Sequence, residues 1–241
     1  MHDISQLTIR EIAIESPAAT RVFEKYKIDY CCGGRRSIKD ACEASGIDRD
    51  ALSKDLEQAL ALPVESELPE QMPIPRLIDH IIDTHHVFTR RELFRLGALM
   101  DKVSSKHGER HPELFKLKSL LTALSDDMLL HLNKEEAALF PYIHQLARAK
   151  ERSTLPVFAP FGSVEHPVGV MENEHEEAGS ILAEMRRITS DYKTPEGACP
   201  SYIALYFGLE ELEKDLHRHI HLENNILFPK AVELEASVFA V

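Results

Sequence analysis

The chain has 241 residues, of which 44% are hydrophobic, and its formal net charge at pH 7 is −12. This length suits one large domain, or a medium domain with a small one, and the apolar share is sufficient for a buried core. The acidic balance disfavours non-specific nucleic-acid binding, which depends on Lys and Arg. We find no apolar run of about eighteen residues that would indicate a membrane span, and no basic and apolar leader typical of secretion.

The cysteines give a further indication of the compartment. The four of them are too few and too unevenly spread for a disulfide framework. A reducing, cytoplasmic location is therefore expected. They are Cys31, Cys32, Cys42 and Cys199.

Residues 1–62 are predicted to form a small helical domain. A Ser-Pro pair at 16–17 is a helix start signal, with the serine as N-cap and the proline in the first turn. Ser37 precedes a short helix that Gly46 can end, and Asp48 can cap another that runs to the end of this segment. Strand signals are absent.

Two stretches rich in proline divide the chain. Residues 63–75 contain four prolines and are predicted to be an interdomain linker. A second stretch, at about 153–167, is predicted to join the two halves of the remaining chain.

Residues 76–241 contain four long amphipathic stripes. The clearest of them advances by alternating steps of four and three residues, which places its members on one face of a helix. Four such helices with short connections predict an all-α fold, an up-down-up-down four-helix bundle. The members of the clearest stripe are Leu205, Leu209, Leu212, Leu216, His219, Glu223 and Ile226.

A motif of the form His-x3-Glu-x3-Leu-Phe-Pro occurs twice, at 131–141 and at 219–229. Another histidine lies at nearly the same distance ahead of each copy, one at position 175 and one at 85 or 86. This duplication predicts two helical hairpins that place the same set of side chains at the same height.

These histidines and glutamates interrupt stripes that should be apolar. Burial of an ionised carboxylate without a partner costs several kcal/mol. A hydrogen-bonded core histidine is the common explanation for a lone buried His, but it gives no reason for the duplication with Glu. Four imidazoles and two carboxylates suit two metal ions, and iron, manganese or zinc rather than calcium or magnesium. The candidate ligands are His131, Glu135, His175, His219 and Glu223, together with either His85 or His86.

Periodicity alone does not separate His85 from His86 as the first ligand. Glu136 leaves the inward face and is expected to be solvated. His144, His217 and His221 lie off the stripe or at its edge, which favours surface or supporting roles.

The chain resembles a known family, the iron–sulfur cluster repair di-iron proteins of the RIC type, whose C-terminal part is hemerythrin-like. The resemblance covers nearly the whole chain. The residues that carry it are Asp29-Tyr30-Cys31-Cys32-Gly33-Gly34, Lys134-Glu135-Glu136, the segment from Met171 to Gly179, and the segment from Leu222 to Pro229.

The resemblance implies that the six candidate residues bind two iron ions, with Glu135 and Glu223 as bridges and with room for an oxo bridge. It favours His86 over His85 as the first ligand. The chain departs from the family pattern at Thr84-His85, so His85 is a candidate modulator of the site.

The pair Cys31-Cys32 precedes two glycines and two arginines near a predicted helix start. Neighbouring positive charge and a helix N-terminus lower the pKa of a thiol. Together with the resemblance, this predicts a redox or iron-transfer role for both cysteines. The alternative is that one of them is a small core residue, as is expected for Cys42 and Cys199.

The resemblance implies a stress-response protein that repairs iron–sulfur clusters damaged by nitric oxide or oxidants, by iron delivery from a labile centre. Its expected partners are damaged iron–sulfur proteins or their assembly machinery, with nitric oxide or oxygen as small ligands, and the family is often dimeric, which admits a homodimer. The alternatives are direct reduction or scavenging of nitric oxide, and sensing of nitric oxide or oxygen. A nucleic-acid or membrane partner is not expected.

Overall fold

The computed structural model describes residues 7–31, 33–61, 68–154 and 161–240. In these residues all regular elements are helical, and a single isolated bridge pairs Thr8 with Ser37. The prediction of an all-α fold is confirmed. None of the described helices is both long enough and apolar enough to cross a membrane.

Four short helices form the N-terminal part: α1 (Ile9–Glu15), α2 (Pro17–Tyr26), α3 (Ile38–Ser45) and α4 (Arg49–Leu60). Ser37 and Asp48 cap α3 and α4 with their side chains, and Gly46 ends α3 at a φ of 64°. These three signals were predicted. Helix α1 was not predicted, although Thr8 and Glu11 form a capping box at its start.

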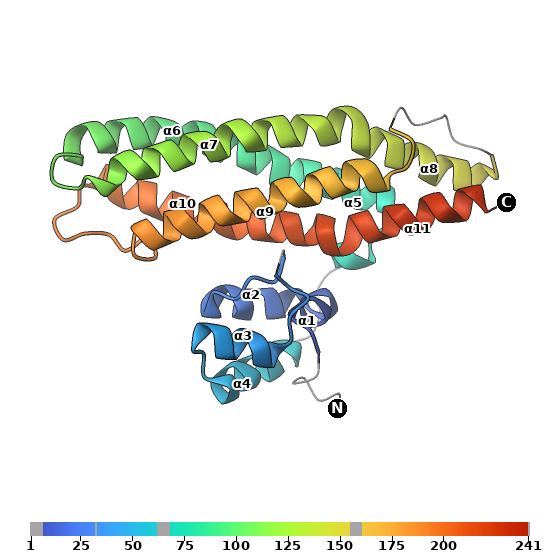
Figure 1. The fold of residues 1–241 in the computed structure, drawn as a ribbon, viewed down its shortest axis with the longest axis horizontal. Helices are drawn as coiled ribbons and strands as arrows, with labels where there is room; N and C mark the ends of the chain where they lie inside the picture. The colour runs from blue at the N-terminus through green and yellow to red at the C-terminus, as the bar shows by residue number, and fades with distance from the viewer. Residues whose placement is uncertain (1–6, 32, 62–67, 155–160, 241) are drawn as a thin grey trace.

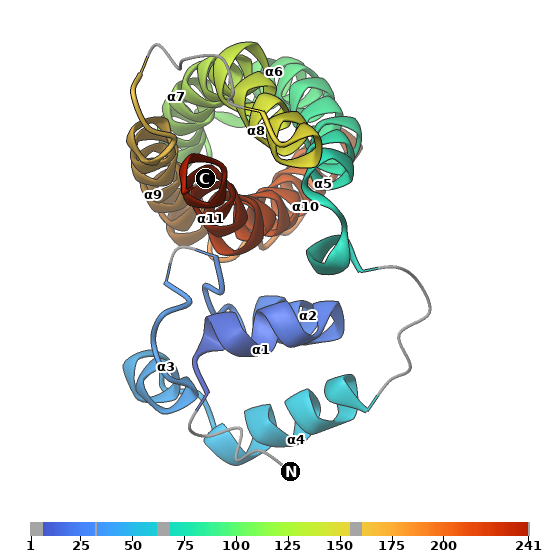
Figure 2. The ribbon, with the colours of Figure 1, turned by 90° about the vertical axis from the view of Figure 1, so that its right-hand side faces the viewer.

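The C-terminal part is a bundle of four long helices (Figure 1). Viewed end-on, the helices surround a common axis (Figure 2). A short 3-10 helix, η2 (Pro69–Gln71), precedes them. The first long helix consists of α5 (Ile74–His80), η3 (Ile81–His86) and α6 (Val87–His107), and the second of α7 (Glu113–Lys134), η4 (Glu135–Leu139) and α8 (Phe140–Arg152). The third is α9 (Glu165–Ile188), and the fourth consists of α10 (Pro200–Leu222), η5 (Glu223–Leu227) and α11 (Phe228–Phe239).

The segments η3, η4 and η5 are π-helical, which the stripes did not predict. In each of them a backbone N–H bonds a carbonyl five residues back, as from Phe140 to Glu135 and from Phe228 to Glu223. Proline lacks an N–H and clashes with the carbonyl four residues earlier in a regular α-helix. The wider π turn accommodates Pro141 and Pro229 without a break in either long helix.

The bundle contains two apolar cores, one toward each end. One core includes Leu96, Leu121 and Leu209, and the other includes Leu77, Ile143 and Phe228. All six candidate ligands fall between these two cores along their helices. A polar layer is therefore closed off by apolar packing on both sides.

The N-terminal part has a core of its own, which includes Ile12, Phe23 and Leu52. It lies beside α10 and η5 of the bundle (Figure 1). The Arg218 guanidinium donates two hydrogen bonds, of 2.9 and 3.1 Å, to the Glu24 carboxylate, and Arg10 donates one to the carbonyl of Asn225. Paired polar contacts of this kind fix the orientation of the two parts.

Glu235 on α11 is buried and stabilises the start of α9. Its carboxylate accepts hydrogen bonds from the Tyr142 hydroxyl at 2.7 Å, the Ser163 hydroxyl at 2.7 Å and the backbone N–H of Val164 at 3.0 Å. Glu235→Ala is expected to lower the free energy of unfolding by about 3 kcal/mol, because several buried donors lose their acceptor together. Denaturant melts would measure the loss, with Glu233→Ala, at an exposed position of the same helix, as the control. An equal effect of both substitutions would contradict this role.

Candidate metal centre

The six candidate ligands meet in the polar layer at the centre of the bundle. Each of the four long helices contributes one histidine, and the second and fourth also contribute a glutamate one turn later. All six side chains are at most 1% exposed. The structure therefore brings all six duplicated side chains together in one buried layer.

The six side chains form two groups that share both carboxylates. One group is His86, Glu135, His219 and Glu223, and the other is His131, Glu135, His175 and Glu223; in each group the potential ligand atoms lie within 4.8 Å of one another. The two imidazole Nε2 atoms are 3.2 Å apart in the first group and 3.0 Å apart in the second.

Each carboxylate reaches a histidine of both groups. Glu135 Oε2 lies 3.5 Å from His86 Nε2 and 3.4 Å from His131 Nε2. Glu223 places Oε1 2.9 Å from His219 Nε2 and Oε2 3.1 Å from His175 Nε2. Two carboxylates placed between two pairs of imidazoles have the arrangement of bridging ligands.

Three of the histidines are oriented by acceptors outside the centre. The Nδ1 atom of His86 lies 2.8 Å from Glu136 Oε1, and that of His131 lies 2.9 Å from Glu174 Oε2. A carboxylate accepts, so Nδ1 carries the proton and the Nε2 lone pair faces inward, as metal ligation requires. Glu136 is half-buried rather than fully solvated as expected, because its carboxylate contacts His86 and Arg90.

In the second hairpin, Asn224 orients a candidate ligand in the same way. Its Oδ1 lies 2.7 Å from His175 Nδ1. Asn224 follows Glu223 as Glu136 follows Glu135, so the residue after each duplicated glutamate orients the lone histidine of its hairpin. That position in the repeat was the sequence signal that could have identified both partners.

The donor set fits a cation. No hydrogen bond satisfies either oxygen of Glu135 or of Glu223, although all four atoms are buried. The Nε2 atoms of His131 and His175 also face each other across only 3.0 Å. Imidazole with carboxylate is a ligand set for transition ions. The residues present therefore fit bound metal.

The two carboxylates differ in their electrostatics. Burial, and then the negative charge of Glu223, raises the pKa of Glu135. Burial would also raise the pKa of Glu223, but the charge of His219 and the close approach of His175 and other histidines lower it well below its usual range. The shared centre accordingly holds unequal charges when no cation compensates them.

The histidines differ as well. Burial opposes protonation of His131, but the charge of Glu135 outweighs it and raises the pKa of His131 to about 9. Burial lowers the pKa of His219 to about 3. The His86/His219 and His131/His175 pairs are thus not electrostatically equivalent.

The Leu-Phe-Pro tail of each motif copy closes the centre from one side. The ring of Phe140 stacks on His86 with centroids 5.7 Å apart, and the ring of Phe228 stacks on His175 at 6.1 Å. Each Phe follows its glutamate through a π turn and packs in an apolar core. The duplicated tail thus has a packing function at the site.

His85 does not belong to either ligand group. Its Nδ1 lies 3.0 Å from Asp215 Oδ1, and its ring lies parallel to that of His219 with centroids 5.7 Å apart. Of the two histidines that periodicity left open, His86 is the one that faces the centre.

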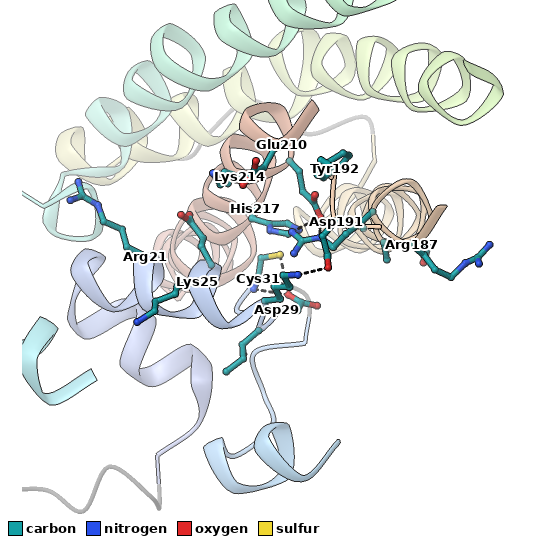
Figure 3. Close-up of a pocket in the computed structure, with 18 of the residues that line it drawn as sticks. Arg21, Lys25, Asp29, Cys31, Arg187, Asp191, Tyr192, Glu210, Lys214 and His217 are labelled. Carbon is teal, nitrogen blue, oxygen red and sulfur yellow. Dashed lines mark hydrogen bonds and ion pairs between the residues drawn. The ribbon is translucent and has the colours of Figure 1, made fainter. Parts of the chain in front are cut away.

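Cys31 lies outside the metal centre. Cys31 is buried with its Sγ 3.2 Å from Asp29 Oδ1, while Cys32 lies outside the described residues. Cys31 and His217 line a pocket of about 910 Å³ between the N-terminal part and helices α9 and α10 (Figure 3). The structure does not bring Cys31 into contact with the six candidate ligands.

The backbone at Tyr30 and Cys31 nevertheless contacts η5, the helix segment that carries Glu223. The amide of Asn225 donates to the carbonyl of Tyr30 at 3.3 Å and lies 2.9 Å from His221 Nδ1. Gly34 permits this close packing, because a Cβ there would lie 2.6 Å from the Tyr30 carbonyl oxygen. His221 is thus buried at the contact of the two parts rather than on the surface.

Two family models match the chain. The hemerythrin HHE cation-binding domain matches residues 77–231, and the domain of unknown function ScdA_N matches residues 5–60. The bundle and its buried His and Glu cluster define a cation-binding protein of the hemerythrin class.

Similar proteins match along nearly the whole chain. The iron–sulfur cluster repair protein YtfE of Yersinia pseudotuberculosis serotype IB (strain PB1/+) is 35% identical over 233 residues, which are 97% of this chain and 100% of that protein. YtfE of Yersinia pestis (strain Pestoides F) matches with the same identity and the same coverage. The chain belongs to this family of iron–sulfur cluster repair proteins.

Proposed function

We propose that this chain is a di-iron protein that repairs iron–sulfur clusters damaged by nitrosative and oxidative stress, by delivery of iron from a labile centre. The relatives named above are iron–sulfur cluster repair proteins, and they match over nearly the whole chain. The observation that carries the proposal is the pair of buried four-residue groups that share Glu135 and Glu223.

The residues that would hold the two irons are His86, His131, Glu135, His175, His219 and Glu223. Bound iron would supply open coordination positions, at which small ligands such as nitric oxide or oxygen bind. In the chain itself, the Nδ1–H groups of three imidazoles donate hydrogen bonds to Glu136, Glu174 and Asn224, so that the Nε2 lone pairs of these imidazoles remain available. The two apolar cores exclude bulk water from the layer.

We assign residues 1–62 to a small helical domain, 63–75 to a linker and 76–241 to the metal-binding bundle. Residues 62–67 of this division lie outside the described residues, and α5 begins at Ile74. In this proposal Cys31 and Cys32 carry iron or electrons between the bundle and its targets, which are damaged iron–sulfur proteins or their assembly machinery in the cytoplasm. The support for their role is the pocket beside Cys31, which opens between the two parts.

A reconstitution assay tests the function. A dehydratase with a nitrosylated [4Fe–4S] cluster is mixed anaerobically with the iron-loaded chain, with free ferrous iron at the same concentration, or with the Cys31→Ser/Cys32→Ser variant. Recovery of dehydratase activity is expected to be fastest with the intact chain and slower with the variant. Recovery no faster than with free iron would contradict the proposal. Continued consumption of nitric oxide without a cluster acceptor would instead indicate a nitric oxide reductase.

A further inference from the structure

The two halves of the metal centre are related by the internal repeat. Under this repeat His86 corresponds to His175, His131 to His219 and Glu135 to Glu223. Two kinds of contact orient the histidines of the His131/His175 half of the centre. Within a hairpin, Asn224 contacts His175 Nδ1, and between hairpins Glu174, the residue before His175, contacts His131 Nδ1.

The first of these contacts is duplicated and the second is not. Glu136 contacts His86 as Asn224 contacts His175. The position equivalent to Glu174 is the residue before His86, which is His85. By analogy with the Glu174–His131 contact, the residue at position 85 would accept a hydrogen bond from His219. His85 instead directs its Nδ1 to Asp215, and its ring stacks on that of His219.

Two buried polar atoms are left without partners at this place. No hydrogen bond satisfies His219 Nδ1, and none satisfies Asp215 Oδ2. The Nδ1 atoms of His86, His131 and His175 all have an acceptor within 2.9 Å. Among the four candidate histidine ligands, His219 is therefore the one whose Nδ1 has no hydrogen-bond acceptor.

We infer that the His86/His219 half of the centre holds its iron less firmly than the His131/His175 half, and that it supplies the iron that leaves the protein. This inference rests on the proposed function and names the half from which delivery starts. Loss of an outer acceptor from a ligating histidine typically weakens metal binding 10- to 100-fold. Because His85 stands where an acceptor for His219 would lie, only the His86/His219 half lacks such an acceptor.

The consequence for delivery is a division of roles. The fully supported half, with Glu174 and Asn224 behind its histidines, retains its ion and keeps the shared carboxylates in place. The other half can then release and accept iron without collapse of the polar layer.

Release of ferrous iron to excess chelator under anaerobic conditions tests the inference, with absorbance as the readout. The intact chain is expected to release two equivalents in two phases whose rates differ by about 10- to 100-fold. His85→Gln, whose amide can accept from His219 and donate to Asp215, is expected to slow the fast phase only. Glu174→Ala is expected to accelerate the slow phase only, and Lys134→Met, which leaves the Glu174–His131 contact in place, serves as its control.

A single release phase for both ions would overturn the inference, as would a faster fast phase in Glu174→Ala with an unchanged slow phase. These outcomes are separate from the repair assay. Two phases with the expected variant effects, but without cluster repair, would leave the assignment of the labile half intact and contradict the proposed function alone.

Discussion

Replacement of Glu135 with Gln is expected to remove iron binding from the bundle while leaving the iron-free protein at least as stable as the intact chain. Burial and the charge of Glu223 raise the pKa of Glu135, so its ionised form at neutral pH destabilises the folded state, and a neutral amide removes that cost. We expect the free energy of unfolding of the iron-free protein to increase, because the cost of the buried negative charge is removed. Calorimetry and iron content together measure the two effects.

The matched control for this experiment is Glu136→Gln. Glu136 accepts from His86 Nδ1 but does not face the centre, so its substitution is expected to weaken iron binding without abolishing it. If Glu135→Gln kept both irons at full affinity, or lowered the stability of the iron-free protein by several kcal/mol, Glu135 would not be a shared ligand of a cation site.

Phe228→Ala is expected to have the largest effect on stability. The Phe228 side chain is 1% exposed, and it stacks on His175. Truncation of a buried Phe leaves a cavity and typically costs about 3–5 kcal/mol. Denaturant unfolding of the iron-free protein would measure this cost, and loss of the stacked ring should also speed iron release from the His131/His175 half.

Phe239 on the same helix provides the control, because 55% of its surface is exposed. Phe239→Ala should change the free energy of unfolding by less than about 0.5 kcal/mol. Similar losses for both substitutions would mean that Phe228 does not pack at the centre as described.

The ligand set was predictable because the repeat records it twice. A single buried histidine has many explanations, but a second copy with its glutamate and its Leu-Phe-Pro tail has few. The periodic stripes likewise predicted the bundle, since apolar residues at steps of three and four must face a common core.

The outer partners were not predictable from the stripes, because they lie beside the inward face rather than on it. Glu136 is the example: it lies beside the inward face, next to Glu135, and its carboxylate still reaches His86. Cys31 shows a different limit, since its position depends on how the two parts of the chain pack together.

The π segments left a weak trace in the sequence. After Glu223 the buried residues Leu227, Ala231 and Glu235 follow at three successive steps of four, whereas a regular helix would insert a step of three. Such a run is short, and it is ambiguous unless the buried face is already known.

Each π segment changes the direction in which the following side chains of a long helix point, without interrupting the helix. A single additional residue advances a helix by about 100°, and in the fourth helix this advance allows both the leucines before Glu223 and the ring of Phe228 after it to face the same axis. Deletion of one residue between Glu223 and Phe228 would therefore rotate the whole of α11, turning the Glu235 carboxylate away from the start of α9. The rotation of the fourth helix about its own axis is thus the same at the metal centre and at the far end of the bundle, where Glu235 contacts the start of α9.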